Sequence, residues 1–107
     1  MKLPKITEDE FLRQVLQLAK LRGWRTAHFR PAMTKKGRWV TAVSGDGKGF
    51  PDLILVRRDS ILVVELKVPP NKLTAEQQEW MDAFERTGIM VLCWTPNDWP
   101  LIEWTLA

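Results

Sequence analysis

The sequence contains one cysteine, Cys93, and one histidine, His28. A single cysteine excludes an internal disulfide, and Cys93 lies in the apolar run 89–94, where we expect a small buried hydrophobic residue and no catalytic thiol. A lone imidazole favours a structural or phosphate-contacting role for His28 over metal binding. The chemistry of this chain is therefore expected to come from carboxylates and amines.

Long hydrophobic runs and an N-terminal secretory signal are also missing. The apolar runs span only a few residues, far short of the ~20 that a membrane helix needs. Residues 1–5 lack the apolar segment and the cleavage site of a secretory signal. We therefore expect a cytoplasmic protein with no membrane partner.

The length and composition predict one globular domain over residues 1–107. A chain of 107 residues is large enough for one hydrophobic core but not for two. Its hydrophobic content of 45% and charged content of 27% are ordinary for a folded soluble protein, so disorder is not indicated. A net charge of +3 and a pI near 9.3 are compatible with a polyanionic partner and also with an ordinary solvated surface.

Basic residues interleave with aromatic ones in the first half of the chain, a combination that suits a nucleic-acid backbone and its bases. Residues 31–49 hold few hydrophobic residues and several glycines, so we expect a mobile, basic flap beside the functional site. The string 45–49 lacks the spacing of a phosphate-binding P-loop, which excludes ATP binding of that type. The residues expected to contact nucleic acid are Arg30, Lys35, Lys36, Arg38 and Lys48.

Two apolar segments, 53–56 and 61–64, predict a β-hairpin with charged residues at its open end. If residues 58–59 form its two-residue turn, antiparallel pairing places Asp52 opposite Glu65. Like charges opposed across two strands destabilise a sheet. The pairing is therefore best explained by a cation that lies between the two carboxylates.

Side chains alternate along a strand, so Glu65 and Lys67 share one face while Val64 and Leu66 face a core. Two acids and one amine then gather at the end of the hairpin. Oxygen ligands with no histidine or cysteine nearby favour a hard divalent ion, Mg²⁺ or Mn²⁺. A structural explanation stays open, with Asp52 as a turn residue after a proline and Glu65 paired with Lys67 at an exposed strand end.

Residues 7–23 predict the first helix. Thr7 is a good N-cap, Glu10 follows three residues later as the partner in a capping box, and Gly23 is a C-terminal stop. Glu8 shares the apolar face of this helix, whereas Glu10 aligns with its polar face. Glu8 is therefore the acid expected to point toward a metal site, although a favourable charge in the first turn of a helix would also explain it.

Residues 24–30 alternate as a strand that ends at a proline. Thr74 caps a second helix, and with Gln77 it forms a capping box that by itself would satisfy Gln77. Residues 89–94 predict a buried strand, reached through a helical crossover and hence parallel to the second arm of the hairpin. Residues 95–100 predict a turn, and residues 101–107 predict a short terminal element that could be a helix or a strand.

Four blocks of sequence resemble the PD-(D/E)XK nuclease superfamily and, more narrowly, the VRR-NUC family with its small stand-alone phage and bacterial members. The blocks are Glu8 in the first helix, Gly49-Phe50-Pro51-Asp52, Glu65-Leu66-Lys67, and Leu73-Thr74-Ala75-Glu76-Gln77 leading to Trp80. The resemblance covers essentially the whole chain. It implies a restriction-endonuclease-like α/β fold with an αβββαβ core, in which helices flank a mixed central sheet, and for a phage-encoded protein it implies the host cytoplasm.

The resemblance implies that the hairpin and the first helix supply the metal ligands. Asp52 and Glu65 would hold Mg²⁺ or Mn²⁺ with the help of the Leu66 carbonyl oxygen. Glu8 would contribute directly or through a water molecule, with Glu10 as the alternative. The number of ions stays open, and two ions would lie about 3.5–4 Å apart.

The other two site residues would act on the reaction itself. By the resemblance, Lys67 would position or help to deprotonate the attacking water, and its charge would stabilise the negative transition state of phosphodiester cleavage. Gln77 would orient that group or touch phosphate, with Gln78 as the alternative.

These features together predict a divalent-metal-dependent DNA endonuclease. The resemblance implies a structure-selective enzyme that acts as a homodimer on branched DNA such as four-way (Holliday) junctions. A small domain offers little surface with which to grip a junction, and six tryptophans leave apolar area to cover, so both features favour a dimer. The alternatives are a non-catalytic nucleic-acid-binding module of the same fold and a sequence-specific restriction-type endonuclease, for which so short a chain has little room.

Overall fold

The computed structural model describes residues 6–29, 32–33, 39–40 and 45–107. The helices are α1 (Glu8–Leu21), α2 (Ala75–Arg86), a short 3₁₀ helix η1 (Pro96–Asp98) and α3 (Trp99–Leu106). The strands are β1 (Arg25–His28), β2 (Ala32–Met33), β3 (Trp39–Val40), β4 (Leu53–Arg57), β5 (Ser60–Leu66) and β6 (Met90–Trp94). Among these described residues, no helix is long and apolar enough to cross a membrane.

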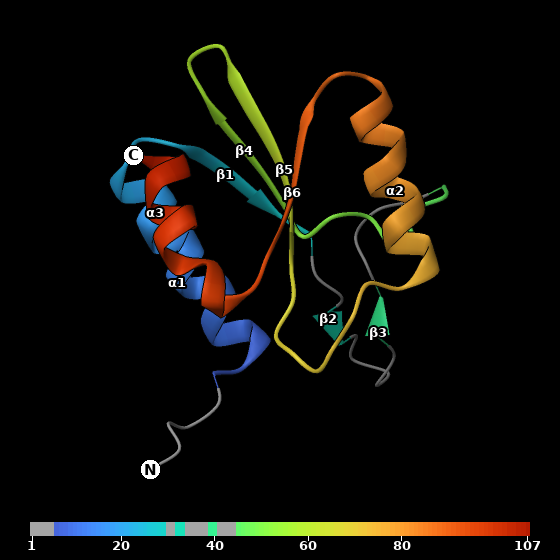
Figure 1. Cartoon of the computed structure of the whole chain (residues 1–107). Helices are drawn as coiled ribbons and strands as arrows, with labels where there is room; N and C mark the ends of the chain where they lie inside the picture. Colours follow the sequence, from blue (N-terminus) through green and yellow to red (C-terminus); the bar gives the residue numbers. More distant parts are fainter. Residues whose placement is uncertain (1–5, 30–31, 34–38, 41–44) are drawn as a thin grey trace.

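The central sheet has four strands in the order β1-β4-β5-β6. The β1/β4 and β4/β5 pairs are antiparallel, and β6 runs parallel to β5 after the crossover through α2. Figure 1 shows α1 and α3 together on one side of this sheet and α2 on the other. The fold is therefore the expected mixed α/β arrangement with a restriction-endonuclease-like core, in which α1, β1, β4, β5, α2 and β6 follow the order αβββαβ.

The β4–β5 hairpin has the predicted register. Arg57 pairs with Ser60, which leaves residues 58–59 as the two-residue turn, and Arg58 adopts a left-handed conformation there with φ of 55°. At the other end of the hairpin Leu53 pairs with Val64. One further step of the same register brings Asp52 opposite Glu65.

The main hydrophobic core lies between the sheet and the α1/α3 layer. Alternation along β5 directs Leu62, Val64 and Leu66 into this core. The other buried members of the cluster are Phe11, Leu12, Val15, Ala19, Trp24, Leu53, Leu55, Trp94, Ile102 and Leu106. Val63 and Glu65 consequently face the α2 side, where Met81 is also buried.

Arg57 ties the end of α3 to the rest of this layer. Its guanidinium carbon lies 4.4 Å from the centroid of the Trp24 ring, within range of a cation–π interaction. The same guanidinium donates hydrogen bonds to the carbonyl oxygens of Arg22 at 3.0 Å, Leu106 at 3.3 Å and Ala107 at 3.0 Å. Trp24 Nε1 donates to the Leu106 carbonyl oxygen as well, at 3.1 Å. Residues 101–106, whose structure the sequence left open, belong to helix α3, which packs on α1 and begins at Trp99 within the segment predicted as a turn.

The predicted strand at 89–94 is present as β6, parallel to β5, but the prediction that it is buried was wrong. Strand β6 lies at the edge of the sheet, and of its residues only Trp94 is buried. Cys93 is exposed, so its expected role as a buried hydrophobic residue was wrong too. An apolar run indicates a strand, but its burial depends on which elements cover the strand on both faces and at its edge.

The expected flap at residues 31–49 falls mainly on residues outside the described ranges. Inside them, β2 and β3 form an antiparallel pair, with Ala32 opposite Val40 and Met33 opposite Trp39. The described part of this connection therefore contains secondary structure of its own. The expected mobility of the flap, and the positions of Arg30, Lys35, Lys36 and Arg38, concern residues that lie outside the described ranges.

Candidate active site

Asp52 and Glu65 are the two buried acidic residues of the described chain, with exposed fractions of 8% and 2%. Asp52 follows the buried Pro51 at the start of β4, and its carbonyl oxygen accepts a 2.8 Å hydrogen bond from Phe29 N at the end of β1. Asp52 Oδ2 accepts a second 2.8 Å bond from Leu66 N, across the hairpin. Backbone donors thus fix Asp52 beside the strand that carries Glu65.

Gln77 reaches the site from the first turn of α2. Its Nε2 donates to Glu65 Oε1 at 3.3 Å. At the same time its Oε1 accepts a 2.9 Å bond from Thr74 N, and its own N–H donates to Thr74 Oγ1 at 3.2 Å, so the predicted capping box is present. The capping box alone does not satisfy Gln77, because it uses only one end of the side-chain amide.

The neighbouring Gln78 points elsewhere. Its Nε2 donates to Asp82 Oδ1 at 2.9 Å, one turn further along the exposed side of α2. The structure therefore brings Gln77, and not Gln78, to Glu65. The sequence left this choice open because either residue of a Gln-Gln pair fits a motif that is read by spacing alone.

Lys67 follows β5 and is half-buried. Its N–H donates to the Trp94 carbonyl oxygen at 2.9 Å, so the pairing of β5 with β6 continues to this residue. The two-residue alternation of the strand gives Lys67 the same face as Glu65.

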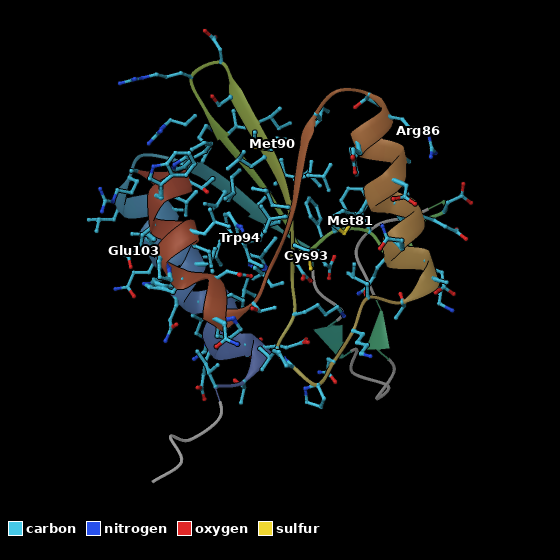
Figure 2. The ribbon with its side chains drawn as sticks, in the orientation of Figure 1. Met81, Arg86, Met90, Cys93, Trp94 and Glu103 are labelled. Carbon is cyan, nitrogen blue, oxygen red and sulfur yellow. The ribbon has the colours of Figure 1, made fainter. Side chains whose placement is uncertain are left out.

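Cys93 lies beside Glu65 in the register of β5 and β6. Figure 2 labels Cys93 together with Met90 and Trp94 of the same strand. Cys93 is exposed as a residue, but partial desolvation of its thiol by neighbouring groups raises the pKa of that thiol. The charge of Glu65 raises this pKa further, and the charge of Lys67 lowers it. A raised pKa keeps the thiol protonated near neutral pH, which disfavours a nucleophilic role.

Glu8 occupies the first turn of α1 and is half-buried, whereas Glu10 is exposed. Glu8 Oε1 accepts a 3.3 Å bond from Asn71 Nδ2, which links α1 to the segment after β5. Glu10 N donates to Thr7 Oγ1 at 3.1 Å, as the predicted N-cap requires. Within the described residues no three acidic, histidine or cysteine side chains form a group that would hold a metal, so the structure does not bring Glu8 into one cluster with Asp52 and Glu65.

The donor set at Asp52 and Glu65 fits a hard divalent cation. It consists of two buried carboxylates opposed across a hairpin, with the Leu66 backbone at the same point of β5. Burying two carboxylates costs desolvation free energy, and a cation bound between them would offset that cost. Oxygen donors of this kind match Mg²⁺ and Mn²⁺ better than softer metals.

The loop at residues 45–50 packs closely against the start of α2. Gly49 has φ of +83°, and a Cβ there would lie 2.6 Å from the backbone carbon of Glu76 and 2.7 Å from Gln77 N. Only glycine fits both the conformation and the space. Trp80 Nε1 donates to the Asp46 carbonyl oxygen at 2.9 Å, which holds the loop on the helix.

Phe50 continues this contact into an aromatic cluster beneath α2. Its ring centroid lies 5.1 Å from that of Phe29, 5.0 Å from that of Trp80 and 5.9 Å from that of Phe84, each in an edge-to-face arrangement. The rings join the end of β1, the loop and α2 just before Asp52. The positioning function of Gly49 and Phe50 was not predicted, although both lie in the motif that precedes Asp52.

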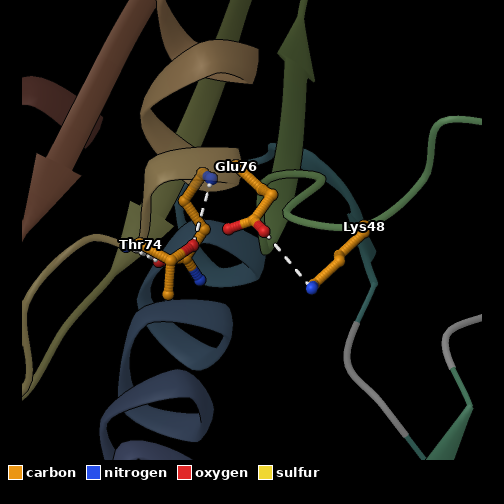
Figure 3. Close-up of polar contacts among 4 residues, drawn as sticks. Lys48, Thr74 and Glu76 are labelled. Atoms are coloured by element: carbon orange, nitrogen blue, oxygen red, sulfur yellow. Dashed lines mark hydrogen bonds and ion pairs between the residues drawn. The ribbon is translucent and has the colours of Figure 1, made fainter.

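Lys48, the one described member of the expected nucleic-acid-binding set, pairs with Glu76. Its Nζ lies 3.2 Å from Glu76 Oε1, and the side chains are 84% and 42% exposed (Figure 3). A hydrogen bond from its own backbone N–H, followed by the hydrogen bond and charge of Lys48, lowers the pKa of the Glu76 carboxyl. A groove of about 580 Å³ adjoins the pair, lined by Gly45, Asp46, Lys48, Glu76, Glu79, Trp80 and Ala83.

A family model described as the VRR-NUC domain matches residues 7–95. The match begins at the N-cap of α1 and ends just after β6, so it includes every element of the αβββαβ core. It also includes Glu8, Asp52, Glu65, Lys67 and Gln77. No curated protein sequence matches the chain.

Proposed function

Because the chain belongs to the VRR-NUC family, and is therefore a nuclease of the PD-(D/E)XK type that acts on DNA, we propose that it is a divalent-metal-dependent DNA endonuclease. The observation that carries the proposal is the buried pair of Asp52 and Glu65, opposed across the β4–β5 hairpin with the Gln77 amide on Glu65. A buried pair of acids is costly as a purely structural feature. It is useful where a cation must be held.

Asp52 and Glu65 would bind Mg²⁺ or Mn²⁺ together with the Leu66 carbonyl oxygen. The bond from Leu66 N to Asp52 holds one carboxylate just before the start of β4, and the bond from Gln77 holds the other, so the ligands would be oriented before a cation arrives. Glu8 would contribute from α1 through a water molecule. When bound, a divalent ion neutralises phosphoryl oxygens and lowers the pKa of a bound water toward neutrality.

Lys67 is the proposed catalytic amine. It follows Glu65 by two residues, is half-buried and shares the strand face of Glu65, so its ammonium group would lie at the end of the hairpin near the carboxylates. There it would orient the attacking water or accept its proton. Its positive charge would also stabilise the extra negative charge of the transition state.

The DNA-binding surface is proposed to include the loop beside α2. Lys48 is highly exposed next to the first turn of α2, close in sequence to the active-site residue Asp52. The full proposed set is Arg30, Lys35, Lys36, Arg38 and Lys48. Contacts of such side chains with phosphates would supply affinity that falls as salt is added.

The preferred substrate is proposed to be branched DNA such as a four-way junction, bound by a homodimer. Helix α3 supports a dimer, because Leu101 and Trp104 are 50% and 78% exposed and lie three residues apart on one face. Exposed apolar area of this kind marks interaction surfaces. Two active sites in one dimer would address two strands of a junction.

The decisive experiment is a cleavage assay with Mg²⁺ or Mn²⁺ on labelled linear duplex, single-stranded, flap and four-way-junction DNA. Glu65→Ala and Lys67→Ala should each lower the cleavage rate by about 100-fold or more. Two matched controls should leave the rate unchanged. Glu85→Ala removes an exposed negative charge from α2 and matches Glu65→Ala, and Lys20→Ala removes an exposed positive charge from α1 and matches Lys67→Ala.

The outcomes separate the proposal from its alternatives. Cleavage that survives Glu65→Ala and Lys67→Ala would remove these residues from the site. Binding without cleavage under every metal condition would favour a non-catalytic module. Cleavage restricted to one short duplex sequence would favour a restriction-type enzyme.

A further inference from the structure

We propose that Thr74 is a positioning residue of the active site, because its capping box holds the side-chain amide of Gln77 in the orientation that presents Nε2 to Glu65. This inference rests on the proposed function, since it assumes that Glu65 is a working ligand. The N-cap of α2 would then serve two purposes: it begins the helix, and it sets the direction of a hydrogen bond to a metal-binding carboxylate.

The geometry of an amide supplies the first step. The oxygen and the nitrogen of the Gln77 side chain lie on opposite sides of one planar group, so a partner that holds the oxygen also fixes the direction of the NH₂ group. Thr74 N holds Oε1 at 2.9 Å, and Nε2 then lies 3.3 Å from Glu65 Oε1. The backbone donor at Thr74 therefore also distinguishes the two ends of the amide, since only the oxygen accepts its hydrogen bond.

The second step concerns how firmly Thr74 is itself fixed. Thr74 Oγ1 accepts from Gln77 N at 3.2 Å, and its carbonyl oxygen accepts from Gln78 N at 3.0 Å. Gly49 packs against the peptide between Glu76 and Gln77, with no room for even a Cβ atom. The first turn of α2, shown with Thr74 and Glu76 in Figure 3, is held from two sides and has little freedom to shift away from the hairpin.

The identity of residue 77 supports a purpose beyond helix capping. A capping box accepts either glutamate or glutamine at this position, because only one side-chain oxygen is needed. With glutamate, the second oxygen would face the carboxylate of Glu65, and two like charges would meet. With glutamine the same position carries a hydrogen-bond donor, as Glu65 requires.

The test compares two substitutions of threonine by valine at opposite ends of α2. Thr74→Val keeps the backbone N–H that holds Gln77 Oε1 but removes the hydroxyl that accepts from Gln77 N, so this donor is no longer fixed in place. Thr87→Val removes a hydroxyl that bonds the Phe84 carbonyl oxygen at the C-cap. Thr74→Ser keeps the acceptor and should behave as wild type. The three variants are compared for single-turnover cleavage at saturating DNA, DNA affinity, Mn²⁺ affinity by isothermal titration calorimetry, and thermal unfolding.

Thr74→Val should lower both the cleavage rate constant and the Mn²⁺ affinity by about tenfold, because Gln77, the partner that orients the Glu65 carboxylate, is then held less firmly. DNA affinity should change little, and Thr74→Ser should restore both values. If Thr74→Val and Thr87→Val have the same cleavage rate and the same Mn²⁺ affinity, then Thr74 is only a helix cap. A wild-type protein that binds Mn²⁺ but does not cleave DNA would contradict the proposed function. The Mn²⁺ affinities of Thr74→Val and Thr87→Val could still be compared, and their difference would decide this inference.

A measurement on the wild-type protein removes any dependence on how the variants fold. The side-chain NH₂ signals of Gln77 in an ¹⁵N-correlated NMR spectrum should shift when Mg²⁺ is added, while those of Gln78, which bonds Asp82, should not. Equal small shifts of both signals would show that the Gln77 amide is not coupled to the metal-binding carboxylate, and would overturn the inference.

Discussion

Lys48 and Glu76 place opposite charges in contact at an exposed edge of the proposed DNA-binding surface. The pKa of the Glu76 carboxyl is lowered, first by its own backbone hydrogen bond and then by Lys48, so Glu76 is ionised near neutral pH. A carboxylate that holds a lysine competes with DNA phosphates for it. Removing that carboxylate should therefore strengthen DNA binding through Lys48.

We predict that Glu76→Gln raises DNA affinity about two- to fivefold at low salt, as expected for the release of one exposed ion pair. The same change in a Lys48→Gln background should have no effect, because no lysine is then released. Fluorescence anisotropy with labelled duplex DNA measures both. An equal effect of Glu76→Gln in the two backgrounds would mean that it reflects general repulsion of DNA and not competition for Lys48.

The direction of the pKa shift also fixes the pH range of this ion pair. A carboxyl with a lowered pKa keeps its stabilising contact above the ordinary glutamate value and loses it only as the pH falls through the lowered value. The advantage of Glu76→Gln should consequently persist from neutral to mildly acidic pH. It should fade only at the acidic end, where wild-type Glu76 becomes neutral as well.

The contact between the loop at 45–50 and α2 shows how an element of the site depends on one glycine. Gly49→Ala would force a Cβ to within 2.6 Å of the Glu76 backbone and would strain a residue with φ of +83°. We predict that it lowers the free energy of unfolding by about 2 kcal/mol or more and also slows cleavage, because Gln77 moves away from Glu65. Urea unfolding and the cleavage assay measure the two effects.

Gly23 provides the matched control, since it has the same φ of +83° but no atom within 4 Å of an added Cβ. Gly23→Ala should cost about 1 kcal/mol of backbone strain and leave cleavage unchanged. Equal losses of stability for the two variants would show that close packing on α2 contributes nothing beyond the strained φ.

The hairpin is the element that the sequence predicts best. Its two-residue turn leaves one register that pairs the apolar arms, and the observed pairing of Leu53 with Val64 follows from it. That register alone brings Asp52 opposite Glu65. Both helix N-caps are also predictable from the sequence, because each depends only on residues three apart: the hydroxyls of Thr7 and Thr74 each accept a hydrogen bond from the backbone N–H three residues later.

What the sequence does not predict depends on contacts between distant elements. The exposure of Cys93 follows from the edge position of β6, and the choice of Gln77 over Gln78 follows from the angle at which α2 meets the hairpin. The type of the last element, 101–107, was open because so short an apolar segment fits either a helix or a strand. Packing of α3 on α1, with Arg57 at its end, decides in favour of a helix.

At the scale of the whole molecule, the exposed face of α3 is the region proposed to join two copies. Trp104→Glu should convert a dimer into a monomer, since it places a charge at the most exposed apolar position of that face. Glu103→Gln, on the adjacent exposed position, is the control and should leave the mass unchanged. Size-exclusion chromatography with light scattering gives the masses. A wild-type monomer, or a dimer that survives Trp104→Glu, would exclude this face as the interface.

The central claim is that carboxylates from the two arms of the β4–β5 hairpin hold a divalent cation. Anomalous diffraction from a crystal soaked in Mn²⁺ tests it most directly. We predict a manganese peak within bonding distance of the carboxylates of Asp52 and Glu65 and of the Leu66 carbonyl oxygen, with the Gln77 amide still on Glu65. A peak elsewhere on the molecule, or no peak with Asp52 and Glu65 turned away from each other, would contradict the account.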